Sequence, residues 1–149
     1  MKYFKKELWK YNNEENEIIW SNNAEKYAKY FESIKKYLPK RFLKVYLNEE
    51  GFHDYVINSI NIDTSVKDRK NNLSRMRVEL KSGQRDFTVE LSGVSAFKID
   101  ISDKSYCICG KLSWGYAEFE RIDAKKMKLS IICDIENELE FVFEKIRIL

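Results

Sequence analysis

Histidine, proline and glycine are scarce in this chain of 149 residues, and each scarcity excludes something. His53 is the only histidine, which almost excludes a His-Asp phosphohydrolase centre, because such a centre needs several histidines. One proline and five glycines leave no flexible linker, and neither a repeat nor a shift in composition divides the chain. We therefore predict a single domain over residues 1–149.

Long apolar runs and a strong net charge are also missing. No run of about 20 apolar residues could cross a membrane, and residues 1–10 lack the apolar core of a signal peptide. The 27 basic and 24 acidic residues give a net charge of +3, which indicates neither nucleic acid nor a membrane as a partner. Three cysteines, an odd number, indicate reduced thiols. These observations predict a cytoplasmic protein.

Basic residues are concentrated in one place, between Lys67 and Arg85. No glycine-rich phosphate loop and no RNA-binding aromatic motif accompanies them. We therefore expect a solvated hairpin face here, rather than a phosphate-binding one.

Apolar residues are plentiful, and their spacing predicts helices first. After Ser21, a predicted N-cap, apolar side chains recur at three- and four-residue steps until Pro39 ends the helix. A second helix is predicted from Pro39 to Glu50, with Gly51 as its left-handed terminator. A leader and these two helices would occupy residues 1–51.

Residues 52–149 alternate between apolar and polar side chains, as antiparallel strands with one buried face do. A change of phase at residues 58–59 predicts a β-bulge. Turns are predicted at residues 82–84 and 92–93, and a break near Glu144. The resulting seven or eight strands are too many for a flat open sheet. We therefore predict an α+β fold in which two N-terminal helices precede a curled antiparallel meander, either a half-barrel or a sandwich.

Candidate catalytic groups are few. A cysteine nucleophile would need His53 as its base, yet nothing around Cys107, Cys109 or Cys133 indicates a reactive thiol. The Cys-x-Cys pair is spaced too widely to form a disulfide and has too few partners for zinc. We therefore predict no catalytic residue, no metal and no cofactor. The main expectation for the pair His53-Asp54 is that the two side chains cap backbone groups at a helix-to-strand junction.

Acidic residues on the predicted polar faces of strands offer a second route to catalysis. Two carboxylates at a set separation could hydrolyse a glycoside. Neighbouring lysines, such as Lys98 and Lys111, instead favour cross-strand ion pairs. The acids in question are Glu90, Asp100, Glu118, Glu120 and Glu140.

Aromatic residues beside a kink at Gly115 are the best candidates for binding. Such residues are typical both of recognition surfaces and of a strand that folds over the edge of a core, and the core interpretation is favoured. The same alternatives apply to the N-terminal aromatics Tyr3, Phe4, Trp9, Tyr11 and Trp20. We expect them to lay the leader segment across the sheet or the helices, and a dimer contact through them stays open. The predicted partner-binding residues are Trp114, Tyr116, Glu118, His53 and Asp54.

Two stretches resemble a known family. The opening MKYFKKELW resembles the start of uncharacterised Firmicutes proteins that usually begin Met-Lys-Tyr-Phe-Thr-Lys-Glu, although Lys5 stands where threonine is usual. A helical region, then His53-Asp54 before a strand, then a meander closing with residues 139–143, resembles the same family. This order also resembles small bacterial immunity proteins, which bind and block a toxin domain. The family has no established activity, so the resemblance implies no catalytic residue.

We therefore expect a bacterial protein that binds another protein without catalysis, of the immunity type. The alternative is a small-ligand-binding protein with a pocket at the mouth of the curled sheet. An enzyme is disfavoured, because it would need a second partner for His53 or a converging pair of carboxylates.

Overall fold

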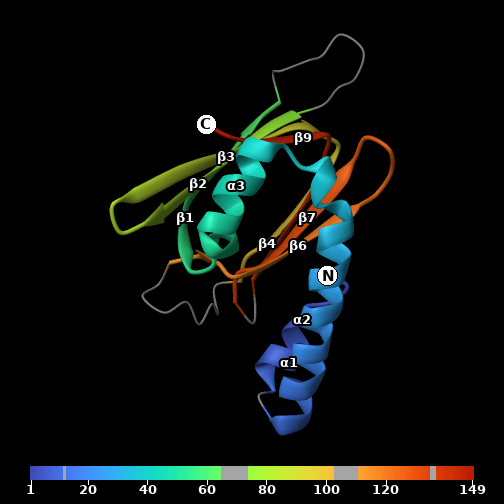
Figure 1. Ribbon diagram of the computed structural model, residues 1–149. Coiled ribbons are helices and arrows are strands. Elements are labelled where there is room, and N and C mark those ends of the chain that lie inside the picture. The colour runs from blue at the N-terminus through green and yellow to red at the C-terminus, as the bar shows by residue number, and fades with distance from the viewer. Residues whose placement is uncertain (12, 65–73, 103–110, 135–136) are drawn as a thin grey trace.

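A computed structural model describes residues 1–11, 13–64, 74–102, 111–134 and 137–149. Helices come first in the described residues, and nine antiparallel strands follow there in two sheets that curl around one core (Figure 1). The prediction of an α+β fold with a half-barrel is confirmed. The predicted number of strands is too low, because the last predicted strand divides at Glu144 into two.

The helices are α1 (Lys6–Lys10), α2 (Glu14–Ile34) and α3 (Lys40–Asn48), with short 3₁₀ turns η1 (Lys35–Tyr37) and η2 (Glu50–Phe52). α2 begins earlier than predicted, because Asn13 rather than Ser21 caps it. The Asn13 side-chain oxygen accepts a hydrogen bond from the Asn16 backbone N–H at 2.9 Å. The apolar stripe begins only after Ser21, so periodicity alone missed the first turns and α1.

The strands form two sheets with antiparallel neighbours throughout. The first sheet has the order β5 (Ser113–Trp114), β1 (Tyr55–Asp63), β2 (Ser74–Ser82), β3 (Arg85–Val94) and β9 (Lys145–Ile148). The second has the order β4 (Ala96–Asp100), β8 (Glu138–Phe143), β7 (Met127–Ile132) and β6 (Tyr116–Arg121). The register of β1 against β2 shifts between Ile57 and Ser59, which confirms the predicted β-bulge.

The chain crosses between the sheets at single residues. These are Ser95 between β3 and β4, Gly115 between β5 and β6, and Glu144 between β8 and β9. A Cβ atom on Gly115 would lie 2.4 Å from the carbonyl oxygen of Ile132, so the crossing has no room for a side chain. The predicted turn at residues 92–93 is wrong, because Gly93 lies inside β3 and the chain continues into β4 without reversing.

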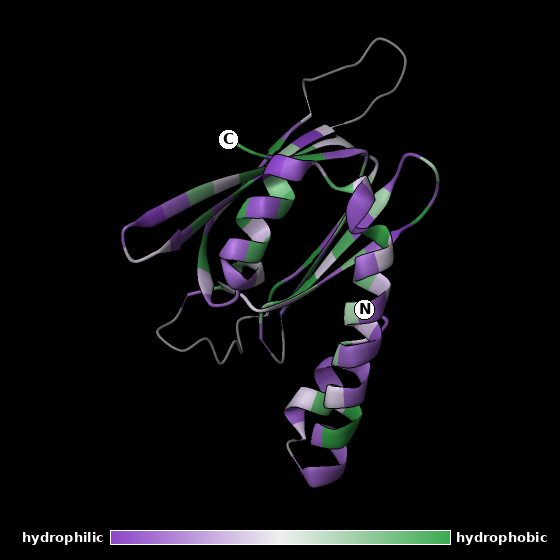
Figure 2. Cartoon of the chain, viewed as in Figure 1, coloured by the Kyte–Doolittle hydropathy of each residue, from purple (hydrophilic) through white to green (hydrophobic). Residues whose placement is uncertain are grey.

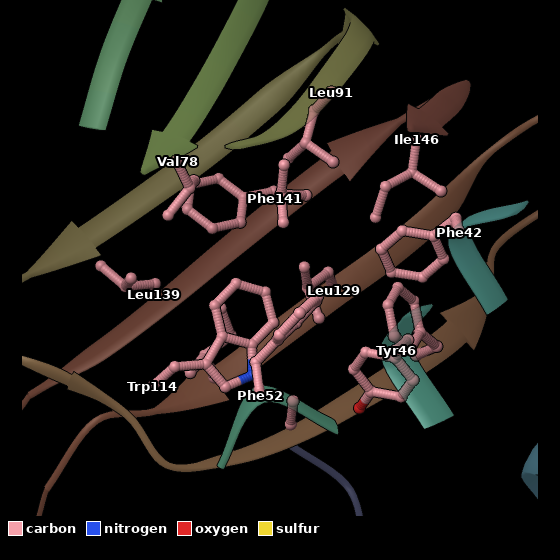
Figure 3. Packing of buried hydrophobic residues seen from close by; sticks show 14 of the residues in the cluster. Phe42, Tyr46, Phe52, Val78, Leu91, Trp114, Leu129, Leu139, Phe141 and Ile146 are labelled. Carbon is pink, nitrogen blue, oxygen red and sulfur yellow. The ribbon is translucent and has the colours of Figure 1, made fainter. Parts of the chain in front are cut away.

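The core fills the inside of the curl. Phe42 and Tyr46 project from α3 toward side chains from both sheets (Figure 3). Phe52 is fully buried, and its ring centroid lies 5.7 Å from that of Trp114. Phe52 and Asp54 both have positive φ, an uncommon conformation for residues other than glycine, so burial of the Phe52 ring helps to offset local backbone strain.

The C-terminal half of α2 covers the free edge of β6. The Tyr27 hydroxyl accepts a hydrogen bond from the Phe119 backbone N–H at 2.6 Å, and the Tyr30 hydroxyl accepts one from the Arg121 N–H at 3.1 Å. Burial raises the pKa of Tyr27, so its hydroxyl remains protonated. These bonds satisfy backbone donors that an edge strand leaves unpaired.

α1 and the N-terminal half of α2 extend beyond the sheets (Figure 1). Apolar residues remain on this projecting part, as the green segments in Figure 2 show. In the described ranges, no helix combines the length and the apolar character needed to span a membrane.

Candidate functional site: an aromatic cleft

The five predicted binding residues divide into a buried and an accessible group. Trp114 is fully buried and Glu118 is 4% exposed, whereas Tyr116 is half-buried and His53 and Asp54 are exposed. Trp114 therefore belongs to the core, the alternative that the sequence favoured at this kink. A partner could touch only the other group directly, and its role in binding stays a prediction.

Tyr116 lies at the centre of an aromatic cluster. Its ring centroid lies 4.7–5.5 Å from those of four other rings, which belong to Trp20, His53, Phe4 and Trp9. Sequence analysis singled out the N-terminal aromatics but could not place them beside Tyr116, because that contact depends on how α2 packs along β6.

A cleft of about 290 Å³ opens beside this cluster, between α1, α2 and the start of β6. We call it the aromatic cleft. Its lining residues are Leu8, Trp9, Asn16, Glu17, Trp20 and Tyr116. Tyr11, Ile18 and Ile19 are further exposed apolar side chains of the projecting part, and they lie outside the lining of the cleft.

The pair His53-Asp54 borders the cluster at Tyr116. His53 Nδ1 lies 3.0 Å from Asp54 Oδ2, and the imidazole meets the Tyr116 ring edge-on. The Asp54 backbone N–H donates to the Trp114 carbonyl at 2.8 Å. The two side chains thus pair with each other instead of capping backbone groups as expected. An imidazole and a carboxylate can pass a proton between them, but a nucleophile or a substrate group would have to complete a catalytic site.

Glu118 contributes to the aromatic cluster indirectly, by binding the N-terminal segment. Its carboxylate accepts hydrogen bonds from three successive backbone N–H groups, those of Lys2, Tyr3 and Phe4, at 2.8, 2.7 and 2.5 Å. The prediction of an exposed carboxylate is wrong here, because the N-terminal segment covers this face of β6. By holding that segment, Glu118 positions the Phe4 ring against Tyr116.

The other four acids expected on exposed strand faces all form ion pairs. Asp100 lies 3.3 Å from Lys98, Glu120 lies 3.0 Å from Lys128, and Glu140 lies 3.8 Å from the amino group of Met1. The fourth, Glu90, lies 2.9 Å from Arg77 and is almost fully buried, which corrects its expected exposure.

Metal chemistry finds no support among the residues that the structure places. Within them, no group of three or more histidine, cysteine, aspartate or glutamate side chains could hold a metal ion. Cys133 is buried. Cys107 and Cys109 lie outside the described residues, as does the part of the basic segment up to residue 73.

No protein-family model matches this chain, and no curated protein matches it. The resemblance to the Firmicutes family therefore rests on the residues quoted for it.

Proposed function

We propose that this protein is a non-catalytic, cytoplasmic binding module that uses the aromatic cleft to bind another protein. One observation carries the proposal: the cleft opens on a projecting part of the molecule where large apolar side chains remain exposed. Tyr11 and Ile18 are each 63% exposed. Aromatic anchors beside a concave site are typical of protein interfaces, and clustered apolar exposure is unusual elsewhere.

The chemistry of the cleft indicates what the partner presents. Trp9, Trp20 and Tyr116 offer aromatic walls for an apolar side chain, and Glu17 adds an exposed carboxylate at the same opening. We therefore infer a partner segment in which an apolar side chain enters the cleft and a lysine or arginine faces Glu17. An immunity-type inhibitor that blocks a toxin domain would act through a surface of this kind.

Capture of a partner from lysate of the source organism tests this proposal. The purified protein and its Trp9→Glu variant serve as bait, at low and high salt and with nuclease, because Trp9 lines the cleft and is 39% exposed. Ile122→Glu is the matched control, because Ile122 is also exposed and follows the opposite end of β6 from the cleft. We expect one stoichiometric protein to bind the native chain and the control, and at least about tenfold less to bind Trp9→Glu, because a charge would replace an apolar anchor.

Equal capture by all three baits would exclude the cleft. Light scattering on the purified chain tests whether a second copy of the chain occupies the cleft. A dimer that dissociates in Trp9→Glu and persists in Ile122→Glu would show that the cleft serves self-association instead.

A groove at the start of β1 favours a second candidate function, binding of a small anion. It encloses about 570 Å³ beside the turn between β2 and β3, and Lys81 and Lys111 are among its lining residues. It lies outside the core that α3 and the curled sheet fill. A carboxylate or phosphate ligand should raise Tm by more than about 2 °C in a thermal-shift screen, and less in Lys81→Gln. A screen without such a shift would count against this function.

A further inference from the structure

The outer face of the first sheet holds a buried carboxylate surrounded by arginines. Val89 and Leu91 point into the core, so Glu90 between them lies on the opposite face, yet it is only 1% exposed. Arg77 on β2 and Arg147 on β9 are its direct neighbours across the sheet. Their guanidinium groups cover it.

The contacts to Glu90 hold the arginines in place from one side. Arg77 Nε donates to Oε2 at 2.9 Å, and Arg147 donates to Oε1 through Nε at 2.8 Å and Nη2 at 2.6 Å. Arg75 Nε lies 3.8 Å from Oε2 and has no hydrogen-bond partner. Terminal guanidinium groups therefore remain for another ligand, and the three side chains are still 35–62% exposed.

Positive charge exceeds negative charge on this part of the face. The strand register sets Arg77, Glu90 and Arg147 in one row and Arg75, Ser92 and Lys145 in the next, and β1 adds Asn61 and Asp63 to these rows. Four cations against two carboxylates leave a local charge of +2, although the whole chain carries only +3.

We propose that this arginine face, formed by Arg75, Arg77, Arg147 and Lys145, binds a carboxylate-rich segment of another protein. Guanidinium groups bind carboxylates through paired, charge-assisted hydrogen bonds, and the buried Glu90 orients these groups in advance. The residues of the two rows include no aromatic ring on which a base could stack, which disfavours single-stranded nucleic acid. The proposal rests on the protein being a binding module and adds a second contact, remote in chemistry from the apolar cleft.

A direct binding measurement tests the arginine face without the cleft. The probe is a short fluorescein-labelled polyglutamate peptide, followed by fluorescence anisotropy at low salt. We expect Arg75→Gln to bind it about tenfold more weakly, because a charge-assisted contact is lost. The double change Arg77→Lys and Arg147→Lys should also weaken binding, because lysine keeps the charge and loses the forked geometry.

The controls separate a specific site from general charge. Lys26→Gln with Lys29→Gln removes two exposed cations from α2, and this variant should bind the peptide as the native chain does. Circular dichroism confirms folding, and Arg75→Gln is expected to fold because its nearest contact with Glu90 is 3.8 Å.

Absence of peptide binding, or equal binding by Arg75→Gln, would overturn the proposal. Tighter binding of a single-stranded oligonucleotide or an anionic vesicle than of the peptide would assign the face to that ligand instead. The cleft variant Trp9→Glu should bind the peptide like the native chain. Failure of the arginine-face proposal therefore leaves the cleft proposal standing, and failure of the cleft proposal leaves the arginine-face proposal standing.

Discussion

Two glutamates on outer strand faces are almost completely buried, and the fold compensates their charges in different ways. Glu90 receives hydrogen bonds from the side chains of Arg77 and Arg147. Glu118 receives them from the backbone of residues 2–4. Burying a carboxylate is unfavourable unless it is paired and hydrogen-bonded, so both arrangements are needed for folding.

The difference shows in what each glutamate organises. Arginine partners keep part of their surface in solvent, so Glu90 arranges a set of cations that another molecule can reach. Backbone N–H groups have no further hydrogen bond to offer another molecule, so Glu118 only attaches a chain segment, which places Phe4 against Tyr116. Burial of Glu90 therefore orients cations on an accessible surface, whereas burial of Glu118 fixes the N-terminal segment to the fold.

Removing the partners of Glu90 tests the first half of this comparison and should have the largest effect. Arg77→Met with Arg147→Met keeps aliphatic cover over Glu90 and removes its charged partners, and we expect a loss of about 3–5 kcal/mol in the free energy of unfolding. Urea denaturation measures it. Adding Glu90→Ala should restore most of the loss, because the unpaired charge is then gone; a triple variant as unstable as the double one would contradict this account.

Glu118→Ala should cost less, about 2–3 kcal/mol, although it removes three hydrogen bonds to a charged group. The cost is limited because the N-terminal segment can detach and hydrate its N–H groups. Hydrogen exchange should show lost protection at residues 2–4, and Glu118→Gln should retain part of it through its remaining carbonyl oxygen.

An exposed glutamate provides the reference for this measurement. Glu32 forms an ion pair with Lys35 at 2.6 Å on the surface of α2, with 65% of its side chain exposed. Glu32→Gln should change stability by less than about 0.5 kcal/mol. A similar value for Glu118→Ala would show that burial of Glu118 contributes little.

Lowering the pH should destabilise the native chain more than the Glu90→Gln variant, and this difference in stability should be smaller than the losses expected on removing the arginine partners of Glu90 or on changing Glu118. Burial alone raises the pKa of Glu90, but hydrogen bonds from Arg77 and Arg147, together with the arginine charges, outweigh burial and hold its pKa below 4.5. The stabilisation is therefore present above pH 4.5 and is lost as the pH falls through the lowered pKa. Urea denaturation at pH 7 and about pH 3 should show a larger loss for the native chain, and equal losses would contradict the assigned charge.

Patterns within a single strand predicted its buried face and its irregularities. Alternation along β2 assigned Met76, Val78 and Leu80 to one face, and all three are buried. The change of phase in β1 predicted its bulge. The burial of Glu118 could not be predicted this way, because the segment that covers it lies more than 110 positions away in the chain.

The candidate site could be predicted only in part from the sequence, for the same reason. Tyr116 was singled out by its place beside a kink, and Trp9 and Trp20 by their aromatic character alone. Their meeting depends on the length of α2, whose polar first turn gives no apolar periodicity to mark where the helix begins. Sequence periodicity reports which face of an element is buried, but not which distant element covers it.

The one-residue crossings at Ser95 and Glu144 also bear on how quickly the chain can fold. They make β3–β4 and β8–β9 two long bent partners that pair on both sides of the crossing. Neither corner can form until these distant segments meet, so the entropic cost of closing a long loop precedes the gain from pairing. We expect folding in milliseconds to seconds rather than microseconds, with the meeting of these two segments as its slow step.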